Sequence, residues 1–145
     1  MSSDQEIFHL VYRSIAEDDL TQKGIDGILR VSHKLNRKAG ISGILIKRGK
    51  VFLQLLEGPK NKVLTTFRRI HQDPRHHSIK TVIETKSSDR LYSNWDMAYV
   101  EDADEHAILE ELIPFLDEAT SFADNSKEAI MPTLKIFSEK LSKES

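Results

Sequence analysis

The stretch Val51-Phe52-Leu53-Gln54-Leu55-Leu56 is the most hydrophobic run of the chain, and a single amide stands within it. If the run is a β-strand, period-two alternation places Phe52, Gln54 and Leu56 on one face. A buried carboxamide without partners costs about 1–3 kcal/mol. The protein interior is therefore expected to offer hydrogen-bonding groups to Gln54.

A second apolar run, Ile7-Phe8-His9-Leu10-Val11-Tyr12, ends in a phenol. As a strand it would present Phe8, Leu10 and Tyr12 on one face. The hydroxyl of Tyr12 and the amide of Gln54 would then both point into apolar surroundings. Such a pair could form the binding site of a large planar ligand.

The order of elements around these runs predicts an α+β fold. The predicted elements are a strand at 7–13, an amphipathic helix from about Ile25 to Gly40, a hairpin of strands at 41–47 and 51–56, a second helix from about Val63 to Ile70, and strands at 78–86 and 95–100. This βαββαββ order resembles the ferredoxin-like split βαβ arrangement, in which helices cover one face of a mixed sheet. Its first and third strands are central neighbours. Tyr12 and Gln54 are therefore expected within hydrogen-bonding reach, beneath the two helices.

The alternation of strands and helices ends after residue 102. Two further helical stretches are predicted at 103–119 and 127–141. Their apolar stripes need a surface to cover, and the second face of the sheet is the expected one. We therefore divide the chain into a domain at 6–101 and a helical extension at 103–145, which is expected to serve output or oligomerisation.

Charge and hydropathy narrow the range of partners. The chain has 21 Lys and Arg against 23 Asp and Glu, and its net charge of −2 gives no electrostatic reason to expect binding to nucleic acid or to an anionic membrane. No apolar stretch approaches the roughly 20 residues that span a bilayer. The N-terminus lacks the basic and apolar regions of a signal peptide. A cytoplasmic protein is expected.

The absence of cysteine excludes disulfides, thiolate zinc sites and photochemistry through a thiol adduct. Histidine remains as a candidate metal ligand, and His71, His76 and His77 lie close together in the sequence. Their spacing matches no common zinc pattern. They are interpreted as a solvated helix end, and no metal site is expected.

Several motifs occur in a fixed order along residues 6–101. They are Leu10-Val11-Tyr12-Arg13-Ser14, Asn36 four residues before Gly40-Ile41-Ser42-Gly43-Ile44-Leu45, Phe52-Leu53-Gln54-Leu55-Leu56-Glu57-Gly58-Pro59, Arg69-Ile70 before Asp73-Pro74-Arg75-His76, and Trp95-Asp96-Met97. With these motifs the region resembles the BLUF domain, a family of blue-light sensors that bind flavin. Residues 103–145 resemble, in outline only, the helical extension of short BLUF proteins.

The resemblance implies roles for the residues of the two apolar runs. Tyr12 matches the tyrosine that donates an electron and then a proton to the photoexcited flavin. Gln54 matches the glutamine that bridges this tyrosine to flavin N5 and O4. Asn36 matches the asparagine that holds the polar edge of the isoalloxazine ring. Many relatives have a second asparagine where this chain has Leu35, so an aliphatic contact replaces a polar one there.

Five further positions carry roles from the same resemblance. Ile25 matches an apolar residue packed on the ring, and Arg69 and Asp73 match positions near its pyrimidine end. From the residues alone, Arg69 and Asp73 could equally be an i,i+4 ion pair. Trp95 and Met97 match a pair on the fifth strand that passes the change outward.

The expected cofactor is FAD, although FMN and riboflavin stay open because the family mainly holds the isoalloxazine. The expected output is contact with a downstream protein or a change of homo-oligomer, and no enzymatic activity is expected. The main alternative is an interaction module that does not respond to light. A flavin-dependent reductase is less favoured because the Gly-x-Gly-x-x-Gly fingerprint is absent. An acylphosphatase-like hydrolase would need a glycine-containing phosphate cradle, which Arg13-Ser14-Ile15-Ala16 does not provide.

Overall fold

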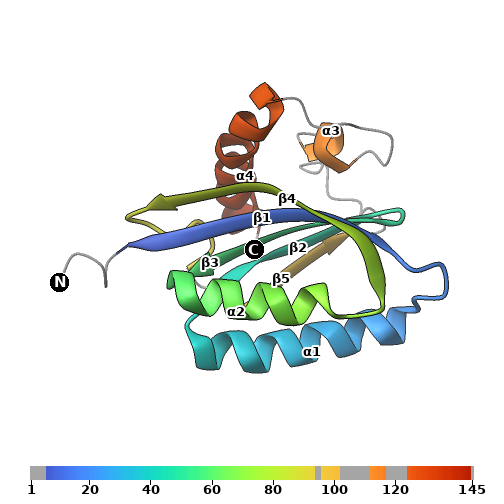
Figure 1. Cartoon of the computed structure of the whole chain (residues 1–145). Coiled ribbons are helices and arrows are strands. Elements are labelled where there is room, and N and C mark those ends of the chain that lie inside the picture. Colours follow the sequence, from blue (N-terminus) through green and yellow to red (C-terminus); the bar gives the residue numbers. More distant parts are fainter. Residues whose placement is uncertain (1–5, 94–95, 102–111, 117–123, 145) are drawn as a thin grey trace.

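A single mixed sheet forms the centre of the protein (Figure 1). The structure, a computed structural model, describes residues 6–93, 96–101, 112–116 and 124–144. Five strands lie in the order β4-β1-β3-β2-β5. They are β1 Ile7–Ala16, β2 Ser42–Arg48, β3 Val51–Gly58, β4 His76–Ser87 and β5 Ala98–Glu101. β3 is antiparallel to both β1 and β2, and β5 is parallel to β2.

Helices cover both faces of this sheet. α1 (Gln22–Ala39) and α2 (Lys60–His71) lie side by side on one face, and α4 (Asp124–Glu144) lies on the other, with the short α3 (Ile113–Leu116) beside it (Figure 1). α1 ends where the sequence predicts, because Gly40 adopts a left-handed conformation with φ 72°, which a residue without a Cβ adopts at little cost. The predicted ferredoxin-like α+β fold is confirmed.

Alternation along the central strands divides the core into two clusters. Beneath α1 and α2 lie Phe8, Leu10, Tyr12, Leu45, Phe52, Leu56 and Met97, and Val63 of α2 packs against them. On the opposite face Val11, Ile44, Ile46, Leu53 and Leu55 pack with Leu112, Phe115 and Leu116 and with Ile130, Leu134 and Phe137 of α4. All eight residues of β3 are buried because both of its faces are covered. This explains why β3 appears in the sequence as one apolar run, and it confirms that the C-terminal helices cover the second face.

The observed boundaries differ from the predicted ones at the sheet edges. β1 continues to Ala16 and β4 begins at His76, since the two strands stay paired as far as Ala16 and His76 through two register shifts. β5 begins only at Ala98, so Met97 precedes the strand. The predicted helix at 103–119 falls mostly outside the described residues, and α4 is longer than the predicted 127–141. Within the described part of the chain, no helix is both long enough and apolar enough to cross a membrane.

Candidate flavin site

Tyr12 and Gln54 face each other across the central strand pair. They are direct partners in the register of β1 and β3, and both side chains are buried. The hydroxyl of Tyr12 donates a hydrogen bond to Oε1 of Gln54. The other end of the amide is also occupied, because Nε2 of Gln54 lies 3.3 Å from Sδ of Met97. The structure therefore supplies the buried partners that the sequence predicted for Gln54.

The surroundings of Tyr12 keep its phenol protonated. Burial, and to a smaller extent the negative charge of Asp73, raises the pKa of Tyr12. Its ring lies 5.3 Å from that of Phe67 and 6.2 Å from that of His76, measured between centroids. A neutral phenol remains a hydrogen-bond donor, so the acceptor end of the Gln54 amide is directed toward it.

A cavity opens above this pair, between α1 and the segment from the end of α2 to the start of β4. Its volume is about 210 Å³, whereas roughly 10–15 Å³ is enough for one water. The sheet contributes Tyr12, Leu45, Phe52 and Gln54 to the wall, and α1 contributes Ile28, Val31 and Ser32. The remaining wall consists of Arg69, Ile70, Asp73, Arg75 and His76. The cavity has room for a ligand much larger than water, with mostly apolar surfaces and a few polar groups.

Asn36 supplies an unpaired acceptor next to the site. Its side chain is fully buried in α1, and Nδ2 donates to the backbone carbonyl of Asp96 at 2.9 Å. Oδ1 is buried and has no hydrogen-bond partner among the described residues. An unpaired buried acceptor is costly, so this atom fits a donor that a ligand would bring. The N–H of an isoalloxazine ring is such a donor.

The acidic and basic residues of the cavity wall pair differently from the i,i+4 alternative. Asp73 binds Arg75, with Nη2 of Arg75 2.6 Å from Oδ2 and Nε 2.8 Å from Oδ1. The hydrogen bond from Arg75 lowers the pKa of Asp73. Arg69 has no salt-bridge partner among the described residues, and burial lowers its pKa while Asp73 opposes that shift. The half-buried guanidinium of Arg69 is thus a donor available to a ligand.

The structure brings together Tyr12, Gln54, Arg69 and Asp73 in one cavity wall. Ile25 and Asn36 are buried in α1 but are not part of that wall, and Met97 is buried against Gln54. Trp95 lies outside the described residues. The functional roles assigned to these side chains remain predictions.

Sequence reasoning missed several residues of the wall, most clearly His76. Its Nδ1 lies 2.8 Å from Oγ of Ser14, and its Nε2 lies 2.8 Å from the carbonyl of Ile70. The interpretation of His76 as part of a solvated helix end was wrong, because the residue begins β4 and pairs with Ala16. No local signal predicts a pairing between residues so far apart in the sequence. The described residues contain no group of three His, Cys, Asp or Glu that could hold a metal ion.

Comparison with known proteins identifies the family of the chain. The family model described as "BLUF: Sensors of blue-light using FAD" matches residues 7–98, which is more than half of the chain. The chain belongs to the BLUF family. As a BLUF protein it is a blue-light sensor of the kind that binds a flavin.

The curated BLUF relatives are much longer than this chain. The "Blue light- and temperature-regulated antirepressor BluF" of Escherichia coli K12 is 41% identical over 70 residues, which are 48% of this chain and 17% of the relative. The "Photoactivated adenylate cyclase subunit beta" of Euglena gracilis is 33% identical over 97 residues, which are 66% of this chain and 11% of the relative. The chain therefore matches less than a fifth of each.

Solved BLUF structures include one of similar length. The dark-state structure of BlrB, a BLUF protein, is 28% identical with a TM-score of 0.77, and the match covers 92% of this chain and 98% of that one. A structure described as "Klebsiella pneumoniae BlrP1 with FMN and cyclic diGMP" is also 28% identical, with a TM-score of 0.65 and coverage of 75% and 30%.

Proposed function

We propose that this BLUF chain binds FAD non-covalently in the cavity between α1 and α2 and that Tyr12 and Gln54 are its photoactive residues. The family description names FAD, and FMN is the alternative because it is named for the Klebsiella structure. The observation that carries the proposal is the buried contact between Tyr12 and Gln54 in a wall that also includes Arg69.

Three side chains are suited to hold the ring. The unpaired Oδ1 of Asn36 would accept a hydrogen bond from a ring N–H. Arg69 would donate to a ring carbonyl, since it has no competing salt bridge among the described residues. Ile25 is buried in the same helix as Ile28, which lines the cavity, and would support apolar packing from α1.

When bound, the flavin absorbs blue light and in its excited state can accept an electron and a proton. Tyr12 is the donor we assign, because its phenol is neutral, buried and hydrogen-bonded within the site. Loss of the Tyr12 proton would remove the donor that holds Oε1 of Gln54. The amide is then free to reorient.

Reorientation of Gln54 has a defined consequence for Met97. In the described state Nε2 of Gln54 donates toward the Met97 sulfur, which is a weak acceptor. If the amide turns, its carbonyl oxygen faces a thioether that has no proton to donate. The contact with Met97 is then lost, and the segment before β5 is released from the site. We propose that light in this way alters the position of the segment before the edge strand β5.

The output of this change is assigned to residues 103–145, with 6–101 as the sensor. We propose that it acts by binding a downstream protein or by changing a homo-oligomer, not by catalysis. The names of the curated relatives include an antirepressor and a cyclase subunit, both light-controlled. In this chain α4 packs directly on the sheet that carries Gln54, which gives a short physical route to the extension.

Absorption spectra in the dark and under blue light test the proposal. Purified protein should carry a flavin spectrum that shifts reversibly to longer wavelength on illumination. Chromatography of the released cofactor would identify FAD or FMN. A colourless protein would contradict the proposal, as would stable photoreduction without a reversible shift.

A further inference from the structure

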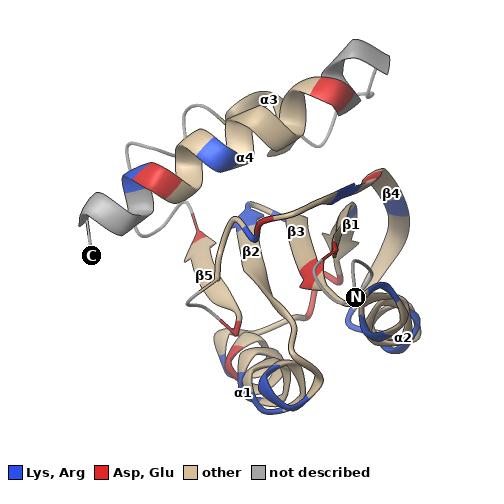
Figure 2. Cartoon of the chain, turned by 90° about the vertical axis from the view of Figure 1, so that its left-hand side faces the viewer, with Lys and Arg blue, Asp and Glu red and all other residues tan. Residues whose placement is uncertain are grey.

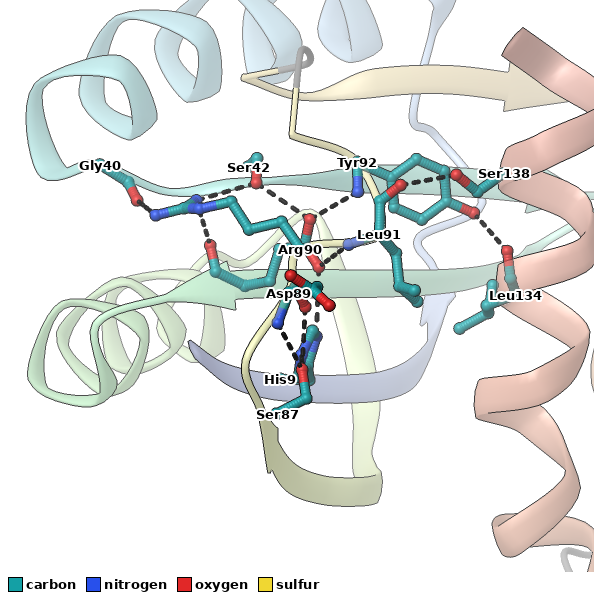
Figure 3. A network of polar contacts seen from close by, with 11 residues as sticks. His9, Gly40, Ser42, Ser87, Asp89, Arg90, Leu91, Tyr92, Leu134 and Ser138 are labelled. Atoms are coloured by element: carbon teal, nitrogen blue, oxygen red, sulfur yellow. Dashed lines mark hydrogen bonds and ion pairs between the residues drawn. The ribbon is translucent and has the colours of Figure 1, made fainter. Parts of the chain in front are cut away.

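Glu57 is a buried carboxylate on the sheet face opposite the flavin cavity. It lies three residues after Gln54 in β3 and is fully buried. Its Oε1 accepts from the backbone N–H of Leu91 at 2.8 Å, and its Oε2 accepts from the backbone N–H of Tyr92 at 2.6 Å (Figure 3). These two residues belong to the connection between β4 and β5, so Glu57 fixes this connection to the centre of the sheet.

Side chains on the neighbouring strands complete the binding of Glu57. Oγ of Ser42 in β2 donates to Oε2 at 3.0 Å, and Nδ1 of His9 in β1 lies 3.1 Å from Oε1. Burial raises the pKa of Glu57, but the hydrogen bonds from His9, Leu91 and Tyr92 outweigh it and hold the pKa below its usual value. The carboxylate is therefore ionised and holds several donors in fixed positions.

Arg90 also attaches the connection between β4 and β5 to the sheet. Its Nη1 donates to Oγ of Ser42 at 2.9 Å and lies 3.2 Å from the carbonyl of Glu57, while its Nη2 donates to the carbonyl of Gly40 at 2.7 Å (Figure 3). The start of the connection is thus tied both to the strands and to the end of α1.

Leu91 and Tyr92, which Glu57 binds, also form hydrogen bonds with α4. The carbonyl of Leu91 accepts from Oγ of Ser138 at 2.6 Å, and the hydroxyl of Tyr92 donates to the carbonyl of Leu134 at 3.1 Å (Figure 3). Leu134 and Ser138 are one turn apart in α4, so the two bonds attach one face of this helix.

The other end of the connection contacts the flavin site. The carbonyl of Asp96 accepts from Asn36, and the sulfur of Met97 accepts from Gln54. One segment between β4 and β5 therefore touches the photoactive amide at 97 and touches α4 at 91 and 92. A movement at Met97 can reach α4 through this segment only if Leu91 and Tyr92 keep their fixed positions against the helix.

We propose that Glu57 is a positioning residue. By holding Leu91 and Tyr92 in place, it allows a structural change at Gln54 to alter the position of α4. This inference rests on the proposed function. Glu57 touches no atom of the flavin cavity wall through its carboxylate, and it acts through Leu91 and Tyr92. Its loss is expected to uncouple α4 from light while the photochemistry continues.

The test uses the full chain with Glu57→Gln, which keeps the size of the side chain but replaces one acceptor oxygen by an NH2 group, which donates and cannot accept a hydrogen bond. Two quantities are measured for each protein: the light-minus-dark absorption spectrum, and hydrogen exchange of backbone amides in α4 in the dark and under blue light. Glu84→Gln is the matched control, because it makes the same substitution at an exposed position of β4.

Wild type and Glu84→Gln should show both the red shift and a light-dependent change of exchange in α4. Glu57→Gln should keep the red shift, exchange several-fold faster in α4 in the dark, and lose the light-dependent difference. A purely structural role would change the dark exchange but leave the difference between light and dark. That result would overturn the inference.

Ser138→Ala covers the case in which Glu57→Gln does not fold. It removes the bond to the Leu91 carbonyl at a buried position where the smaller alanine fits, and it should reduce the light-dependent difference in α4 without altering the spectrum. A full difference in this variant would also overturn the inference. Absence of a red shift in the wild type would instead contradict the proposed function. A red shift with light-independent exchange in wild-type α4 would contradict the inference and the assignment of output to residues 103–145, but not flavin binding or the roles of Tyr12 and Gln54.

Discussion

The chemistry of the site depends on the two different ends of one amide. Gln54 accepts from Tyr12 with its oxygen and donates toward Met97 with its nitrogen. Exchanging the two ends of the amide would weaken both contacts. A neutral phenol is a good donor to the amide oxygen, whereas a thioether has no proton to donate and is only a weak acceptor for the amide nitrogen. The described arrangement therefore matches the oxygen of the amide to the protonated Tyr12 and its nitrogen to Met97.

Tyr12→Phe should retain flavin and lose the reversible photocycle. The ring of Phe fills the same space beside Phe67, but it has no transferable proton and no donor for Gln54. Gln54→Leu should behave likewise, because no amide remains to reorient. The measurement is the light-minus-dark spectrum of each variant loaded with flavin. A normal red-shifted product in either variant would refute the assigned role.

Asn36→Ala should weaken flavin binding more than it alters photochemistry. The substitution removes the acceptor that fits a ring N–H, at a cost of about 1–3 kcal/mol, which corresponds to an increase in Kd of roughly fivefold to more than a hundredfold. Flavin titration monitored by absorbance or fluorescence measures it. His33→Ala, at an exposed position of the same helix, is the control and should bind like wild type. Unchanged affinity of Asn36→Ala would assign ring recognition to other groups.

At the scale of elements, alternation along each strand predicted much of the site. Tyr12 and Gln54 could be placed on facing strands because each strand has a period of two and the split βαβ order makes the strands neighbours. Pairings across long sequence distances could not be predicted in the same way. The extension of β1 and β4, which brings His76 into the cavity wall, depends on register shifts that leave no local pattern.

The buried carboxylate of Glu57 shows a second limit of sequence reasoning. Glu57 follows an apolar run, but its partners Leu91 and Tyr92 use backbone N–H groups that any residue could supply. Asp73 differs, because its ion-pair partner is the side chain of Arg75, two residues later, and not the residue one turn earlier. A side-chain pattern cannot reveal an acceptor that is satisfied by the main chain of a distant loop.

The ionised state of Glu57 predicts a pH dependence of stability. Its pKa is held below the ordinary 4.5 in the folded protein. The contribution to the free energy of unfolding is therefore present above about pH 4.5 and is lost as the pH falls through the folded pKa. Glu57→Gln should be clearly less stable than wild type at pH 7, and the difference should shrink on acidification. Urea unfolding of both proteins from pH 7 down to about pH 3, well below the ordinary pKa, measures it, and a pH-independent difference over that range would contradict an ionised Glu57.

On the scale of the whole molecule, a small net charge conceals an uneven distribution. Lys and Arg gather on the two helices that enclose the cavity (Figure 2). The exposed cations there are Lys23, Arg30, Lys34, Arg37 and Lys38 on α1 and Lys60, Lys62 and Arg68 on α2. The composition alone gave no indication of this, because a sum of charges contains no positions.

This cationic layer should favour flavins that carry phosphate. A positive surface around a binding site attracts an anionic ligand, and salt screens that attraction. We expect the association rates of FAD and FMN to fall between low and high salt, while that of riboflavin, which has no phosphate, stays nearly constant. Stopped-flow mixing with apoprotein measures all three. Equal salt dependence for riboflavin would assign the effect to something other than the phosphate.

Removal of the C-terminal extension tests whether flavin binding and light-dependent output belong to different layers of the molecule. The α1 and α2 side contains the whole wall of the cavity, whereas Ile130, Leu134 and Phe137 of α4 cover apolar residues on the other face. A chain cut after Asp102 should therefore still bind flavin and shift its spectrum in light. It should also associate or aggregate, because Val11, Ile44, Ile46, Leu53 and Leu55 lose their cover.

Size-exclusion chromatography and pull-down, each in the dark and under blue light, compare the truncated protein with the full chain. A truncated protein that keeps a full light-dependent change in size or partner affinity would locate the output in residues 6–101.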